Sequence, residues 1–73
     1  MVFPLGLLAE GETAVVVGTA GEAQRAQDMG LRAGKQVKVL SNAGRGPLLL
    51  KVNNSRIAIS RIAAMKILVR RTA

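Results

Sequence analysis

Apolar and polar residues alternate along most of this chain with the period of two that is typical of half-buried β-strands. In the segment 48–52, for example, Leu48, Leu50 and Val52 alternate with Leu49 and Lys51. Glycine, asparagine or proline interrupts each run, so every segment is short. The pattern predicts five strands, which lie at about residues 12–17, 35–41, 47–52, 55–60 and 66–71.

Residues 22–29 follow a helical pattern instead, with good helix formers and an acidic residue in the first turn. We expect Gly30 to end this helix in a left-handed conformation, with Met29 and Leu31 anchored in the core. A helix of this length does not persist alone, so packing must hold it. The side chains expected to provide that packing are Ala23, Ala26 and Met29.

Five short strands can bury their inward faces only by curling into a closed or nearly closed barrel. Residues 61–65 are too few for a full helix and fit one helical turn. We therefore expect a mainly β protein, a small barrel of five strands with one short α-helix between the first and second strands. The 73 residues suffice for a single domain that spans residues 1–73.

The composition indicates a folded chain that has neither disulfide nor histidine ligands to stabilise it. Cysteine and histidine are absent, and 49% of the residues are apolar. The apolar N-terminal stretch contains Pro4 and Gly6, lacks a basic leading segment and reaches Glu10 after nine residues. It is neither a signal peptide nor a membrane span. We expect a cytoplasmic protein with no membrane insertion.

Charge is distributed unevenly along the chain. The net charge is −3 over residues 1–28 and +10 over residues 29–73, which together give +7. Such a balance indicates an anionic partner, which could be a nucleic acid, an acidic protein face or the inner leaflet of a membrane. Phe3 is the only aromatic residue, which disfavours a barrel that stacks the bases of single strands. Alternatively, the cations are solvated charges on outward strand positions, which keep a small sheet soluble and its edges unpaired.

The residues required for metal binding or catalysis are scarce. Ferrous sites favour imidazole and carboxylate ligands, and Glu10 and Glu12 are the only close pair of carboxylates. The glycine-rich segment 44–47 lacks the Lys-Ser/Thr ending of a phosphate-binding loop. No base other than lysine is evident for the serines. We expect no enzyme, no cofactor and no resident metal.

A set of spaced motifs covers nearly the full length of the chain and resembles the FeoA family. These are small cytoplasmic proteins associated with bacterial ferrous iron uptake, and their domain also occurs at the end of some metal-dependent repressors. The motifs are Leu5 and Leu8 before Gly11-Glu12, Met29-Gly30-Leu31 followed by Gly34, Gly46-Pro47, Arg56-Ile57-Ala58, and Ala64 with Ile67 and Val69. The positions taken as structural are Gly11, Gly30, Leu31, Gly34, Gly46, Pro47 and Ala64.

The resemblance implies an SH3-like β-barrel and a role beside FeoB, a membrane transporter with a cytosolic GTP-binding domain. The chain would bind or regulate that transporter and would be recruited by it to the inner face of the membrane. Two features depart from the family pattern. Ala26 replaces a larger apolar residue on the helix, which would weaken or displace a partner contact there, and residues 42–45 form a small, basic loop.

Outward aliphatic residues suggest where a partner binds. Leu49 and Leu68 occupy outward strand positions, unless the barrel and its helix simply cover them. Lys51 and Arg56 would direct such a surface toward an acidic partner or the inner leaflet. The alternatives are a small basic barrel that binds nucleic acid and a free-standing relative of the repressor domain. The candidate partner-binding residues are Arg25, Ala26, Met29, Leu49, Lys51, Arg56 and Leu68.

Overall fold

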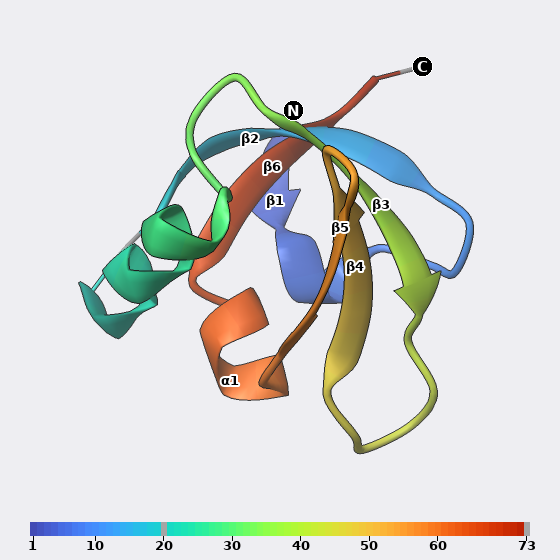
Figure 1. Ribbon diagram of the computed structural model, residues 1–73. Coiled ribbons are helices and arrows are strands. Elements are labelled where there is room, and N and C mark those ends of the chain that lie inside the picture. The colour runs from blue at the N-terminus through green and yellow to red at the C-terminus, as the bar shows by residue number, and fades with distance from the viewer. Residues whose placement is uncertain (20, 73) are drawn as a thin grey trace.

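Six strands, rather than the five that the alternation predicts, form one antiparallel sheet in the computed structural model, which describes residues 1–19 and 21–72 (Figure 1). The sheet curls around an aliphatic core in the order β1-β6-β2-β3-β4-β5. The strands are β1 (Val2–Pro4), β2 (Thr13–Thr19), β3 (Gln36–Ser41), β4 (Leu48–Val52), β5 (Ser55–Ile59) and β6 (Ile67–Arg71). Two 3₁₀-helices, η1 (Leu5–Leu7) and η2 (Gly21–Met29), and one short α-helix, α1 (Arg61–Ala64), complete the elements.

The strand that the sequence did not predict is β1. It has three residues, too few to show an alternation, and one of them is Pro4. The strand lies at the edge of the sheet and pairs only with β6, where Phe3 faces Val69. Proline is tolerated there because an edge strand leaves one row of backbone groups unpaired.

The core is aliphatic, and the described residues contribute no buried polar or charged side chain to it. On β4 the burial alternates as predicted, and the same holds for the inward positions of β3 and β6. On β2 the buried face is that of Ala14 and Val16. The buried apolar residues are Leu5, Leu8, Ala14, Val16, Ala26, Leu31, Val37, Val39, Leu48, Leu50, Val52, Ile59, Ala64, Ile67 and Val69.

Helix η2 is of the 3₁₀ type and ends where predicted. Gly30 has a φ of +99°, and its N–H donates to the carbonyl of Gln27 at 3.1 Å. Ala26 and Leu31 are buried as expected, but Met29 is 42% exposed, so its predicted anchoring in the core is wrong. The small side chain of Ala26 lies on the side of η2 that faces the core. Met29 lies instead at a groove on the surface, described below. The predicted contact of Ala23 lies outside the described side chains.

The C-terminal end of β6 is tied to both neighbouring strands. Arg71 donates from Nε to Glu12 Oε2 at 2.9 Å, and its guanidinium lies 4.8 Å from the centre of the Phe3 ring. The backbone N–H of Ala9, which donates to Oε1 at 2.8 Å, and the hydrogen bond from Arg71 together lower the pKa of Glu12. Glu12 therefore joins the chain before β2 to β6.

The loop before β4 has a structural role that its composition does not reveal. The side-chain amide of Asn42 donates to the carbonyl oxygens of Leu8 at 2.6 Å and Gly6 at 3.4 Å. The backbone N–H of Asn42 donates to Glu10 Oε1 at 3.1 Å. Asn42 thus holds the end of β3 against η1.

The left-handed conformation of Gly30 leads to a stability prediction. We expect Gly30→Ala to lower the free energy of unfolding by about 1–2 kcal/mol, because a Cβ disfavours positive φ. Gly46→Ala is the matched control, since no atom lies within 4 Å of its added Cβ and its φ is not in the left-handed region. Urea unfolding of both variants measures the difference, and equal stability would contradict this account of the helix end.

The lowered pKa of Glu12 leads to a prediction about acid stability. A carboxylate whose pKa is lower in the folded state stabilises fully above its ordinary value of 4.5, and this contribution is lost as the pH falls through the lowered pKa. Glu12→Gln should therefore flatten the fall of the thermal unfolding midpoint as the pH falls below the ordinary value of 4.5. Arg71→Gln should flatten it less, because the hydrogen bond from Ala9 is the larger cause and remains.

Candidate functional site

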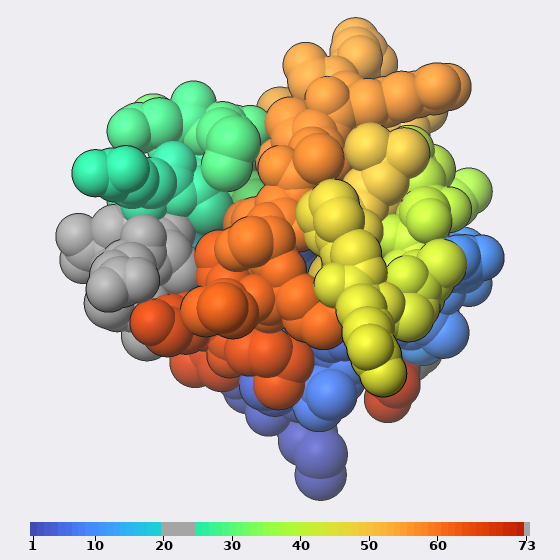
Figure 2. Space-filling view, turned by 90° about the horizontal axis from the view of Figure 1, so that it is seen from below, coloured from blue at the N-terminus to red at the C-terminus, as the bar shows by residue number. Residues whose placement is uncertain are grey.

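A groove of about 590 Å³ opens where η2 meets the end of β5 and α1 (Figure 2). This volume falls in the range of sites that receive a small molecule or several side chains of a partner. The groove is larger than a second hollow of about 300 Å³ beside β2, β3 and β4. The lining residues are Arg25, Ala26, Met29, Ala58, Ile59, Ser60, Ile62, Ala63 and Lys66.

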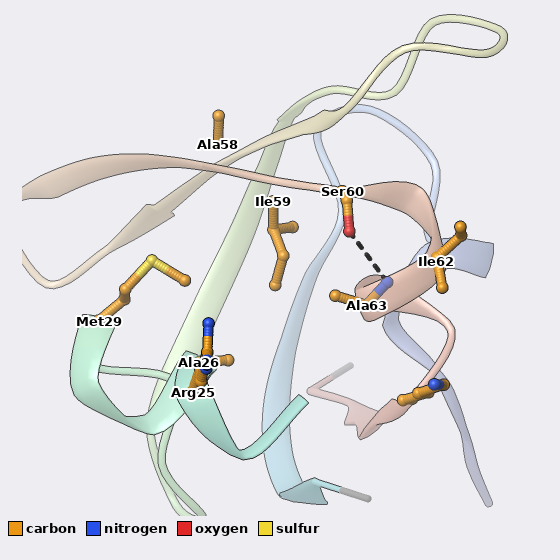
Figure 3. A pocket seen from close by; sticks show the side chains of 9 residues that line it. Arg25, Ala26, Met29, Ala58, Ile59, Ser60, Ile62 and Ala63 are labelled. Carbon is orange, nitrogen blue, oxygen red and sulfur yellow. Dashed lines mark hydrogen bonds between the residues drawn. The ribbon is translucent and has the colours of Figure 1, made fainter. Parts of the chain in front are cut away.

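The local sequence explains how α1 forms one wall of the groove. Ser60 follows β5 directly and caps α1, because its Oγ accepts a hydrogen bond from the N–H of Ala63 at 3.1 Å. Ile59 ends β5 and points toward Ala26 and Ala63 at the floor (Figure 3). Two alanines at the floor keep the groove open where larger side chains would fill it.

Two large apolar side chains that line this groove are exposed, and two more are exposed on or next to neighbouring elements. Ile62 on α1 is 74% exposed, Met29 on η2 is 42% exposed, and Met65 directly after α1 is 43% exposed. Leu7 on η1, an element that contacts α1, is 61% exposed. Exposed apolar residues scattered singly are ordinary, but two that line the same groove, Met29 and Ile62, are typical of a surface that another molecule covers.

The charged groups that line the groove are cations. Arg25 comes from η2 and Lys66 from the turn before β6, and none of the described lining residues is acidic. Arg61 lies nearby on α1 and donates from Nη2 to the carbonyl of Gly46 at 3.0 Å. A partner that enters this groove therefore meets apolar walls and a positive rim.

The structure divides the predicted partner-binding residues between separate places. Arg25, Ala26 and Met29 line the groove, whereas Leu49, Lys51, Arg56 and Leu68 do not. Leu49 and Leu68 are each 37% exposed, as their outward positions predicted. They lie on β4 and β6, which β2 and β3 separate in the sheet, so they do not form one patch.

Sequence reasoning missed Ile62, which is exposed and lines the groove. A signal was available in the segment that starts at Ser60. With serine as the N-cap, the apolar residue before it often packs against the fourth helical residue, which here pairs Ile59 with Ala64 on the core side. This phase of the helix leaves Ile62 on the opposite side of the turn, exposed to solvent.

Three cations form a row across the outward face of the sheet. Lys38 on β3 faces Lys51 on β4, and Lys51 faces Arg56 on β5. Directly opposed side chains on neighbouring strands lie about 4.5–5.5 Å apart at Cβ, and like charges at that distance are destabilising. Thr13 on β2 continues the row, so no carboxylate within it offsets the repulsion. We call Lys38, Lys51 and Arg56 the cation row.

The described part of the chain lacks the donor set of a metal centre. No group of three or more histidine, cysteine, aspartate or glutamate residues comes together there. Glu10 and Glu12, the close carboxylate pair of the sequence, instead accept hydrogen bonds from Asn42, Ala9 and Arg71. Among the described helices, none is long and apolar enough to cross a membrane.

Comparison with known proteins places this geometry in context. The FeoA domain model matches residues 3–71. A protein of Methanocaldococcus jannaschii, named provisionally as Fe(2+) transport protein A, is 39% identical over 70 residues, which cover 92% of this chain and 84% of that protein. A crystal structure of an iron uptake regulatory protein (FeoA) has a TM-score of 0.89 at 32% identity and covers 97% of both chains.

Another solved structure bears on the barrel. The FeoA of Stenotrophomonas maltophilia, solved with zinc and described as a prokaryotic SH3 domain protein, has a TM-score of 0.81 at 26% identity. The match covers 90% of this chain and 87% of that one. These similarities confirm the mainly β, SH3-like barrel expected from the sequence.

The cation row leads to a prediction that separates repulsion from packing. We expect Lys51→Glu to raise the free energy of unfolding by about 0.5–1.5 kcal/mol, because two repulsive cross-strand pairs become attractive. Lys35→Glu, in the exposed turn before β3, changes the net charge equally and should have little effect. The gain should disappear in about 1 M salt, where screening is nearly complete. An equal gain in both variants would mean that net charge alone matters.

Proposed function

The chain belongs to the FeoA family, and on this premise we propose that it is a non-catalytic accessory protein of ferrous iron uptake. Its partner is the cytosolic, GTP-binding part of a FeoB-type membrane transporter. The observation that carries this proposal is the groove between η2, β5 and α1, with exposed apolar side chains around it. Ferrous iron is the cargo of the transporter, and the chain acts on the transporter rather than on the ion.

The groove supplies both main contributions to binding. Covering Ile62 and Met29 removes apolar surface from water, which is worth about 25 cal/mol for each Å². Arg25 on the rim favours a partner surface that carries carboxylates.

Leu49 and Leu68 remain weaker candidates for the contact. Each is exposed on an outward strand face, but neither lies in a hollow and the two do not adjoin. Protein interfaces concentrate their energy in desolvated pockets, which favours the groove over either single leucine. The proposed place of action is the cytoplasmic side of the membrane, which the chain reaches through its partner.

A binding titration against the cytosolic region of the FeoB-type transporter from the same organism tests the proposal. We expect Ile62→Glu to weaken binding by about tenfold or more, because a charge would replace an exposed apolar side chain beside the groove. The fold should survive, since Ile62 is largely exposed. Leu68→Glu is the matched control on β6 and should change the affinity about twofold or less.

The rate of GTP hydrolysis by that cytosolic region, with and without the chain, measures the effect of binding. A changed rate that Ile62→Glu abolishes and Leu68→Glu preserves would support the proposal. Absence of binding by the unmodified chain would overturn it. The opposite ranking of the two variants would move the contact from the groove to β6.

A further inference from the structure

The free edge of β5 adjoins the groove. Strand β5 is the last in the sheet order and pairs with β4 alone. An edge strand presents unpaired N–H and C=O groups, which are a template for another strand. Ala58 lines the groove, yet its side chain points away from it (Figure 3). Its backbone is therefore the part that faces the groove.

The hydrogen bonds of β3 identify which backbone groups of β5 are free. Val39 accepts from Gly11 at 2.8 Å and donates to Glu12 at 3.0 Å, so its backbone faces the β2 side. Backbone N–H and C=O groups alternate in direction along an antiparallel strand, so those of Lys38 point toward β4. Lys51 is paired with Lys38, so the N–H and C=O groups of Lys51 point back toward β3.

The same alternation continues into β5. The N–H and C=O groups of Leu50 and Val52 therefore point toward β5. Their partners on β5 are Ile57 and Ser55, whose N–H and C=O groups point toward β4. Arg56 and Ala58 lie between and beyond these positions, so their N–H and C=O groups point to the free edge. No backbone hydrogen bond of the described residues reaches either of them from that side. Two donors and two acceptors are thus available in a row.

The cation row ends at this edge. Arg56 is its outermost member, because β5 is the edge strand. A strand added there would place one side chain directly opposite Arg56, where a carboxylate is favourable and a cation is not. The side chains on either side of it would point to the other face, toward the groove and its floor of Ala26 and Ile59.

We propose that β5 accepts an extended segment of the partner as a further strand, with an acidic side chain opposite Arg56 and small or apolar neighbours entering the groove. The identity of the partner rests on the proposed function, whereas the chemistry of the segment follows from the edge and the cation row. A second copy of the chain fits poorly, because two cation rows would meet at a net charge of +7 each.

The Ala58→Pro substitution tests the backbone contact. Proline is tolerated on an edge strand where its missing N–H would face outward, so Ala58→Pro removes a free donor without breaking the pairing with β4. Against the cytosolic region of the transporter, Ala58→Pro should bind about tenfold more weakly, and Ala58→Ser, which keeps the N–H, about as tightly as the unmodified chain. Circular dichroism establishes that each variant is folded.

Two further measurements keep the test decisive if Ala58→Pro does not fold. Arg56→Glu should weaken binding about tenfold, and Lys38→Glu, in the same row but two strands from the edge, should weaken it much less. Exchange of the Arg56 and Ala58 amide hydrogens with solvent should slow in the complex. Unchanged exchange in a formed complex, or equal effects of Arg56→Glu and Lys38→Glu, would overturn the inference. So would a free chain that sediments as a dimer through this edge.

If the unmodified chain does not bind the cytosolic region, the proposed function fails and a peptide pair still tests the edge. One peptide alternates glutamate with valine, and the other alternates lysine with valine. The inference requires that the glutamate peptide bind more tightly and slow amide exchange at Arg56 and Ala58. Equal binding of the two peptides, or no binding by either, would overturn it.

Discussion

Strand β6 lies between β1 and β2, and the rest of the structure depends on that double pairing. Val69 faces Phe3 on one side and Val16 on the other. The pairing brings residues from the two ends of the fold together, and Arg71 reinforces it through Glu12 and the Phe3 ring. Because β1 is held there, η1 lies beside α1, the element that forms one wall of the groove.

The groove is a result of the way the barrel remains open. No strand joins β5 to β1 in the described sheet, and η2 and α1 lie beside the free side of β5 instead. The helices cover the core with small residues, Ala26 and Ala63, so they leave a hollow at the surface rather than a filled seam. The fold and the candidate site therefore share one cause, since the barrel is completed by helices and not by backbone pairing.

Local rules predicted most of the strands, and tertiary placement explains the remainder. In β3, β4 and β6 successive side chains point to opposite faces of the sheet, so the alternation alone predicted correctly which residues are buried. Strand β1 was missed because its three residues are too few to show an alternation. Helical phase places Met29 near Ala26 but does not give its depth. The groove combines residues from three elements far apart in sequence, a juxtaposition that no local pattern contains.

The cation row extends from the edge beside the groove across the open face of the sheet, and this placement has a consequence for kinetics. Charged side chains on an open face act at a distance and raise the rate of encounter with an acidic surface, whereas apolar contacts act only after docking. The association rate should therefore fall steeply with ionic strength, while the lifetime of the complex should depend on it less, because only the charge opposite Arg56 remains to be screened after docking. In dilute salt the association rate constant should therefore be high, and the dissociation rate constant should be set mainly by the short-range contacts in the groove.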